Sequence, residues 1–211
     1  MKSLLLGIAI ILLIGIGGFV YRNAAENPTQ PVACPVNYFT CPDGTQVPHL
    51  AGSCSFPSCP PPNVSLPDSN ISFALPDGFS ATTTPDAASI AAYSSTSTST
   101  SAATIVIRRF SIEASSTALA TIEQTAIGGA SGAPVPFTSL SSTSLGGTNF
   151  TVVPIQRFEG VIDTAYYLSR GADVVRFDAI DSNVANWTAS GLNINQLPAE
   201  AALRKLLSTL Q

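Results

Sequence analysis

The stretch VIDTAYYLSRGADVVRFDAI, residues 161–180, decides the fold. Its two halves, residues 161–169 and 172–180, are rich in β-branched and aromatic side chains, a composition typical of strands. Arg170-Gly171 gives a connection as short as an antiparallel hairpin needs. We therefore predict two antiparallel strands here, which belong to a larger sheet.

Segments that precede this stretch extend the sheet. Residues 148–158 predict a strand that reaches the next one through Gly160, so that three strands form a meander. Residues 104–112 predict a strand with apolar side chains on both faces. Residues 71–75 alternate apolar and polar side chains, as a half-buried strand does. The sheet is therefore expected to be antiparallel.

Two segments have helical patterns. The first is expected to begin at Ser116, whose hydroxyl can cap it, and to end near Ala126. The second begins near Pro198, a residue suited to a first helical turn. In it, Glu200 and Arg204 stand four residues apart, a spacing that favours an ion pair on the face directed away from the sheet. Its apolar stripe, at the spacing of a buried face, is Leu203, Leu206, Leu207 and Leu210.

These elements predict an α+β fold, in which an antiparallel β-sheet has flanking helices. Residues 71–211 are long enough to form one domain with its own core. Two further segments preceding it complete the predicted organisation: residues 1–22 as a membrane anchor and residues 23–70 as a stalk and linker.

The N-terminal segment is strongly apolar. Residues 4–20 read LLLGIAIILLIGIGGFV and carry no charge, which predicts one transmembrane helix at the short end of the usual length. Lys2 precedes the segment and only Arg22 follows it closely, so the charge bias places the rest of the chain outside. A cleaved signal peptide is the alternative. Both predict an extracytoplasmic C-terminal domain, and the anchor predicts a single-pass protein of the cell membrane.

The stalk is rich in proline and contains every cysteine of the chain. Clustered cysteines outside the membrane predict two disulfides in a small unit that has almost no apolar core. Three pairings are possible and all stay open. A zinc site would favour C-x2-C spacing, which this segment lacks, and His49 is expected to be a solvated loop residue. The cysteines are Cys34, Cys41, Cys54 and Cys59.

The cysteine region resembles two known modules. CPVNYFTCPDGT, residues 34–45, is similar to the start of a Kazal-type serine-protease inhibitor, although that family has six cysteines and this region has four. CPDGTQVPHLAGSCSFPSCP, residues 41–60, resembles a four-cysteine module of exported bacterial proteins. That module has no established activity, so it implies none here.

The C-terminal domain also resembles a family. The motifs are ISFALPDGF (71–79), TAYYLSRGADVVRFDA (164–179) and LRKLLSTLQ (203–211). Together they resemble PsbP-like domains and their bacterial relatives. The resemblance implies an antiparallel sheet with flanking helices, and it implies no catalytic residues.

Composition excludes several function classes. Only 10% of residues are charged and the net charge is −4, so the basic stripe of a nucleic-acid-binding protein is absent. A single histidine excludes mechanisms that need two imidazoles in one chain. No phosphate loop or dinucleotide fingerprint occurs, so we expect no cofactor, and no metal site is expected.

Acidic residues and arginines lie on or just beyond the predicted strands. Cross-strand ion pairs on a solvated sheet face are the favoured interpretation, and a carboxylate- or phosphate-binding face is the alternative. The acidic residues are Asp163, Asp173, Asp178 and Asp181, and the basic ones are Arg108, Arg109, Arg157, Arg170 and Arg176. A ligand or partner face is predicted to include Arg108, Arg176, Tyr166, Tyr167 and Trp187.

We therefore predict a membrane-anchored, extracytoplasmic binding or assembly protein that is not an enzyme. Its expected partner is another envelope protein, and its N-terminal helix is expected to contact the membrane. One alternative is a serine-protease inhibitor that acts through the cysteine unit. The other is an envelope hydrolase with carboxylate chemistry at Asp163, Asp173 and Asp178.

Overall fold

The computed structural model describes residues 16–18, 21–22, 36, 38–41, 46–50, 53–59, 61–95, 102–128 and 132–211. The chain divides into two compact units. The first comprises Met1–Phe39 and Val47–Ser58, and the second Thr40–Gln46 and Cys59–Gln211. The second unit contains the main sheet and both described α-helices.

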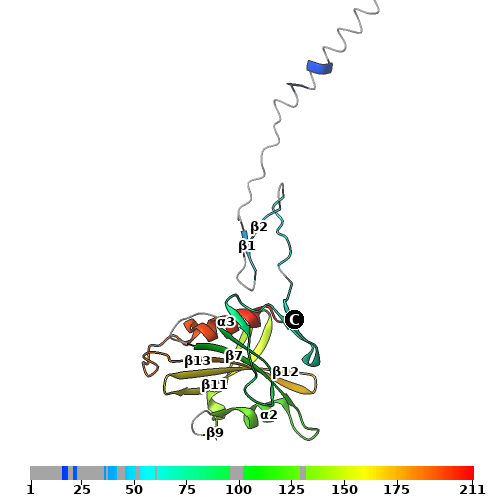
Figure 1. Ribbon diagram of the computed structural model, residues 1–211. Coiled ribbons are helices and arrows are strands. Elements are labelled where there is room, and N and C mark those ends of the chain that lie inside the picture. Colours follow the sequence, from blue (N-terminus) through cyan, green and yellow to red (C-terminus); the bar gives the residue numbers. More distant parts are fainter. Residues whose placement is uncertain are drawn as a thin grey trace, which may run out of the picture. The chain divides into compact units, whose positions relative to one another are not determined.

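The main sheet is antiparallel and, over the described residues, has the strand order β10-β11-β12-β13-β7-β6-β5 (Figure 1). The predicted meander is confirmed, because β11, β12 and β13 are consecutive neighbours. Register is continuous between β12 and β13, where Tyr166 faces Phe177. The strands are β5 (Phe79–Ala81), β6 (Ser89–Ser95), β7 (Ala102–Ser111), β10 (Ser141–Leu145), β11 (Thr148–Phe158), β12 (Val161–Arg170) and β13 (Asp173–Ser182).

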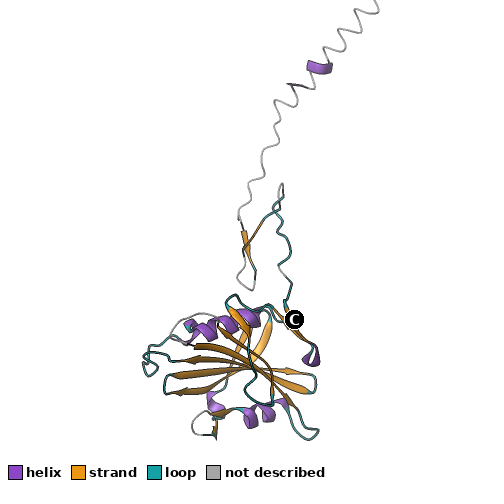
Figure 2. Ribbon diagram, in the orientation of Figure 1, coloured by secondary structure: helices purple, strands orange, loops and turns teal. Residues whose placement is uncertain are grey.

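Each face of this sheet packs against one α-helix (Figure 2). Helix α3 (Pro198–Ser208) covers the face that presents Phe150, Tyr166 and Phe177, and its buried leucines complete that core. Helix α2 (Ala118–Thr125) covers the other face, where Ile122 packs with Tyr167 and Val174. Because neighbouring residues of a strand point to opposite faces, Tyr166 and Tyr167 belong to different cores.

The start of α2 differs by one residue from the prediction. Thr117, and not Ser116, is the N-cap, and its side-chain oxygen accepts a hydrogen bond from the backbone N–H of Ala120 at 3.1 Å. The cap satisfies one of the N–H groups that the first helical turn leaves without a partner.

Substitution at the cap tests this assignment. Thr117→Ala is expected to lower the free energy of unfolding by about 1 kcal/mol, because the N–H of Ala120 loses its acceptor. Ser116→Ala is the matched control and is expected to change stability by less than about 0.5 kcal/mol. Denaturant unfolding followed by the fluorescence of Trp187, the single tryptophan, measures both. A larger loss in the Ser116 variant would assign the cap to Ser116.

The remaining described elements are short. Two-stranded sheets pair β1 (Tyr38–Thr40) with β2 (Gln46–Pro48), β3 (Val64–Leu66) with β4 (Ile71–Phe73), and β8 (Ile127–Gly128) with β9 (Ala133–Pro134). The 3-10 helices are η1 (Pro67–Ser69), η2 (Phe137–Ser139) and η3 (Ile194–Gln196). The segment predicted as a strand at residues 71–75 thus pairs with β3 and lies outside the main sheet. The chain's last residue, Gln211, exchanges two backbone hydrogen bonds with Ser72 of β4.

A disulfide joins Cys41 to Cys59. Cys54 is also disulfide-bonded, whereas Cys34 lies outside the described residues. In the first unit, the rings of Phe39 and Phe56 pack at 5.8 Å between centroids. The prediction of disulfides in the stalk is therefore confirmed for this described pair.

The predicted α+β class is wrong. The part of the chain that the structure describes is mostly β, with a large antiparallel sheet and two α-helices of 8 and 11 residues. In the main sheet, strands β5, β6 and β10 are not expected from the sequence, because they lie in serine-, threonine- and alanine-rich segments that lack an alternating apolar pattern. Their backbone groups pair with longer neighbours, and this pairing needs no apolar side chain.

The predicted membrane helix at residues 4–20 lies largely outside the described residues. Within the residues that are described, no helix is both long and apolar enough to cross a bilayer.

Candidate functional site

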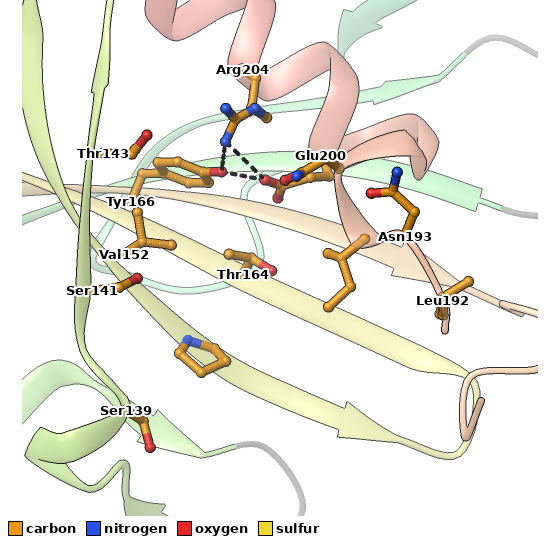
Figure 3. Close-up of a pocket in the computed structure, with 13 residues that line it drawn as sticks. Ser139, Ser141, Thr143, Val152, Thr164, Tyr166, Leu192, Asn193, Glu200 and Arg204 are labelled. Atoms are coloured by element: carbon orange, nitrogen blue, oxygen red, sulfur yellow. Dashed lines mark hydrogen bonds and ion pairs between the residues drawn. The ribbon is translucent and has the colours of Figure 1, made fainter. Parts of the chain in front are cut away.

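An open groove of about 520 Å³ lies on the α3 face of the sheet (Figure 3). Strands β10, β11 and β12, the segment around η3 and the start of α3 form its walls. The lining residues are Ser139, Ser141, Thr143, Val152, Pro154, Thr164, Tyr166, Leu192, Asn193, Ile194, Asn195, Glu200 and Arg204. We call this the α3-face groove.

Three polar side chains form a connected group at one end of the α3-face groove. The hydroxyl of Tyr166 donates a hydrogen bond to Oε1 of Glu200, and Nη1 of Arg204 donates to the Tyr166 hydroxyl at 2.9 Å. Arg204 Nη1 also lies 4.0 Å from Oε1 of Glu200. Figure 3 shows how these side chains converge from β12 and from successive turns of α3. All three side chains therefore come from regular elements, one strand and one helix.

Glu200 is the unusual member of this group. Its side chain is buried, and its Oε2 atom has no hydrogen-bond partner. Burial raises the pKa of Glu200, and the bonds from Tyr166 and the charge of Arg204 oppose that shift. Burial also raises the pKa of Tyr166, so its hydroxyl stays protonated and available as a donor. A buried carboxylate oxygen without a hydrogen-bond partner lowers the stability of a folded protein. A bound ligand could supply the missing hydrogen bond.

Asp181, from the end of β13, places Glu200 in position. Its two carboxylate oxygens accept hydrogen bonds from the backbone N–H groups of Ala199 (2.8 Å) and Glu200 (3.3 Å). These bonds cap the first turn of α3, where a negative charge also interacts favourably with the helix dipole. Burial raises the pKa of Asp181, and the two backbone hydrogen bonds oppose that shift. Asp181 therefore has a structural role.

A second charged cluster lies on the α2 face. Asp178 is fully buried and accepts hydrogen bonds from Arg108 on β7 and from Arg176, its neighbour two residues earlier on β13. Arg176 also donates to the backbone carbonyl of Thr125 at 2.9 Å and lies over the ring of Tyr167. Because Arg108 and Arg176 are directly opposite across the two strands, the carboxylate of Asp178 offsets the repulsion between them.

Asp163 is the fourth titratable member of this cluster, and its Oδ2 atom lies 3.8 Å from Nη2 of Arg176. Burial raises its pKa well above the usual range, and the nearby charge of Asp178 raises it further. Burial also raises the pKa of Asp178, against the lowering effect of the two arginines. The pair therefore favours a single negative charge on Asp178 and a proton on Asp163.

The structure divides the predicted ligand face into three places. Arg108, Arg176 and Tyr167 lie together on the α2 face, whereas Tyr166 lies in the α3-face groove. Trp187 follows β13 and packs edge to face with Phe158, at 6.2 Å between ring centroids. These five residues therefore do not form one face, and the predicted grouping is wrong.

The other predicted charged residues have structural partners. Arg109 pairs with Asp173 at 3.0 Å. Arg157 donates to the backbone carbonyls of Trp187 and Ala189, and Arg170 donates to that of Gln211 at 3.4 Å. Cross-strand ion pairs are present for Arg108–Asp178 and Arg109–Asp173. The expected solvated face is wrong for the first pair, because Asp178 is fully buried. In the described residues, no group of three or more acidic, histidine or cysteine side chains could hold a metal ion.

Sequence reasoning did not assign Glu200 and Arg204 to a site. Their spacing predicts an ion pair on the outward face of α3. The pair exists, but the outward placement is wrong for Glu200, which is buried. The sequence did not indicate that Glu200 is buried. Helical periodicity shows which face of a helix is apolar, but it does not show that the sheet extends over the start of the helix. Apart from Thr164 and Tyr166 on β12, the groove's hydroxyl and amide residues come from segments that have no recognisable pattern.

Comparisons with known proteins include a distant structural likeness. No protein-family model matches the chain, and no curated protein matches it. Among solved structures, the crystal structure of a protein from Bacteroides thetaiotaomicron VPI-5482 matches with a TM-score of 0.41 and 11% identity. The match covers 67% of this chain and 44% of that one, so this chain spans less than half of that protein's length. A likeness at this level carries no argument, and the resemblance to PsbP-like proteins stays a prediction.

Proposed function

We propose that this protein is a membrane-anchored, extracytoplasmic binding protein without catalytic activity, and that its ligand occupies the α3-face groove. The observation that carries the proposal is a groove of small-molecule size whose polar lining includes a buried carboxylate oxygen with no partner. Binding sites commonly combine an apolar lining with a few fixed polar groups. The apolar segment at residues 4–20 supplies the membrane attachment in this proposal.

The arrangement of carboxylates supports binding over hydrolysis. Glycoside hydrolysis needs two carboxyl groups that flank the substrate. Asp163 and Asp178 are instead packed with arginines under α2, and Asp173 pairs with Arg109. In the α3-face groove, Glu200 is the one carboxylate among the lining residues. An envelope protein as partner stays a prediction from the sequence.

The proposal is tested by nuclear magnetic resonance on the full-length chain in detergent micelles. The compounds added are neutral oligosaccharides, short peptides, amino acids and phosphorylated metabolites. We expect at least one class to shift the backbone signals of Thr143, Asn193 and Arg204, with the compound recovered unchanged. Shifts confined to the α2 face, no shift from any class, or conversion of the compound would each overturn the proposal.

A further inference from the structure

We infer that the α3-face groove binds an uncharged, polyhydroxylated molecule, a short saccharide. This inference rests on the proposed function and names the class of its ligand. It depends on the charge, the hydrogen-bonding groups and the apolar surface that the groove presents together.

The charge of the groove favours a neutral ligand. Of its lining residues, Glu200 and Arg204 are charged, and they lie at the same end, 4.0 Å apart between Oε1 and Nη1. An anion bound there is repelled by the carboxylate of Glu200, and a cation is repelled by the guanidinium of Arg204. Each therefore has an unfavourable repulsion energy in addition to its desolvation energy. A neutral ligand has only the desolvation energy.

The hydrogen-bonding groups match those of a polyol. Hydroxyl and primary amide side chains both donate and accept hydrogen bonds, as sugar hydroxyls do. Arg204 adds donors, and Oε2 of Glu200 adds an acceptor that has no partner in the protein. Because Glu200 lines one end of the groove, a ligand hydroxyl bound at that end is placed to complete this missing bond. The groups that both donate and accept are on Ser139, Ser141, Thr143, Thr164, Asn193 and Asn195.

The apolar part of the lining fits the remaining surface of a sugar ring. Val152 and Pro154 on β11 and Leu192 and Ile194 near η3 line the same groove. Aliphatic side chains contact the C–H faces of a ring, while the polar groups fix its orientation. The groove volume of about 520 Å³ lies within the usual range for small-molecule sites, ~300–1,000 Å³.

The inference is tested by calorimetric titration of the full-length protein with maltotriose, cellotriose and tri-N-acetylchitotriose. We expect one of these probes to bind with an affinity that does not change between low and high salt, because a neutral ligand has no charge to screen. Glu200→Gln is expected to weaken binding about tenfold or more, because the buried acceptor is replaced by an amide. Glu123→Gln, on the exposed side of α2, is the matched control and is expected to leave the affinity unchanged.

A second variant keeps the test independent of folding. Asn195 is exposed, so Asn195→Ala is expected to weaken binding without lowering the thermal midpoint. If peptides or charged compounds shift the groove signals while no saccharide binds, the inference fails and the proposed function stands. If no compound shifts them, both fail. Unchanged saccharide affinity in both the Glu200 and Asn195 variants would overturn the assignment to this groove.

Discussion

Replacing Asp178 with asparagine is expected to lower the free energy of unfolding by about 3 kcal/mol. Removing one partner of a buried ion pair costs about 3–5 kcal/mol, because the other charge is left uncompensated. Asp178 is the shared acceptor of Arg108 and Arg176, and the side chain of Arg176 is 8% exposed. The loss is placed at the lower end because Asp163, 3.8 Å from Arg176, can ionise and replace part of the missing charge. Denaturant unfolding of the full-length chain measures it.

Asp163→Asn is the matched control, and its expected effect has the opposite sign. The raised pKa of Asp163 favours its protonated form in the folded protein. Asparagine is neutral and has nearly the same shape as a protonated carboxyl, so the variant folds without having to take up a proton. A carboxyl whose pKa is raised on folding contributes stability that is present below its unfolded pKa and is lost as the pH rises. The asparagine variant should therefore be more stable than the natural protein at pH 7. This difference should vanish as the pH falls towards the ordinary pKa of 3.8.

The two substitutions together separate this account from a general effect of burial. If burial alone mattered, both asparagine variants would shift stability in the same direction, because both carboxyls are buried. A stabilising Asp178→Asn substitution, or an Asp163→Asn variant whose difference from the natural protein does not depend on pH, would contradict the assignment of the charge to Asp178.

The central strands could be predicted because their composition is decisive. Residues 148–158 coincide with β11, and the predicted strands at 161–169 and 172–180 differ from β12 and β13 by one or two residues at their ends. These strands are buried between two helices, so β-branched and aromatic residues dominate them. Because both faces of the sheet are buried, the neighbouring residues Tyr166 and Tyr167 point into two different cores.

Most of the candidate site could not be predicted, for a physical reason. Tyr166, which was expected on a ligand face, and Thr164 lie on the predicted strand β12. The other polar groups come from η2, from β10, from the segment around η3 and from the start of α3, which are far apart in the sequence. Serine, threonine and asparagine in these segments are equally compatible with exposed loops. Only the pairing of β10 with β11, for example Thr143 with Phe150, brings the hydroxyls over the sheet beside Glu200.

Gly146 holds this wall of the groove in place. Gly146 and Gly147 form the two-residue connection between β10 and β11, and both have positive φ, at 58° and 84°. Paired residues with positive φ are typical of tight hairpins and favour glycine. A Cβ atom on Gly146 would lie 2.2 Å from the backbone carbonyl oxygen of Ser208 in α3, whereas one on Gly147 would meet nothing within 4 Å.

Gly146→Ala is therefore expected to lower the free energy of unfolding by about 3 kcal/mol. Left-handed backbone strain accounts for about 1–2 kcal/mol of this loss, and the collision with the backbone of Ser208 adds about 1–3 kcal/mol. Gly147→Ala is the matched control, because its φ is also positive and a Cβ atom there meets no neighbour, and it is expected to lose about 1–2 kcal/mol. Denaturant unfolding followed by Trp187 fluorescence compares the two.

Equal losses of stability in the two variants would show that the end of α3 moves away freely. A larger loss for Gly146 means that the hairpin and the helix are packed as one wall, and the same variant should then weaken binding in the α3-face groove, because Ser141 and Thr143 shift with the hairpin.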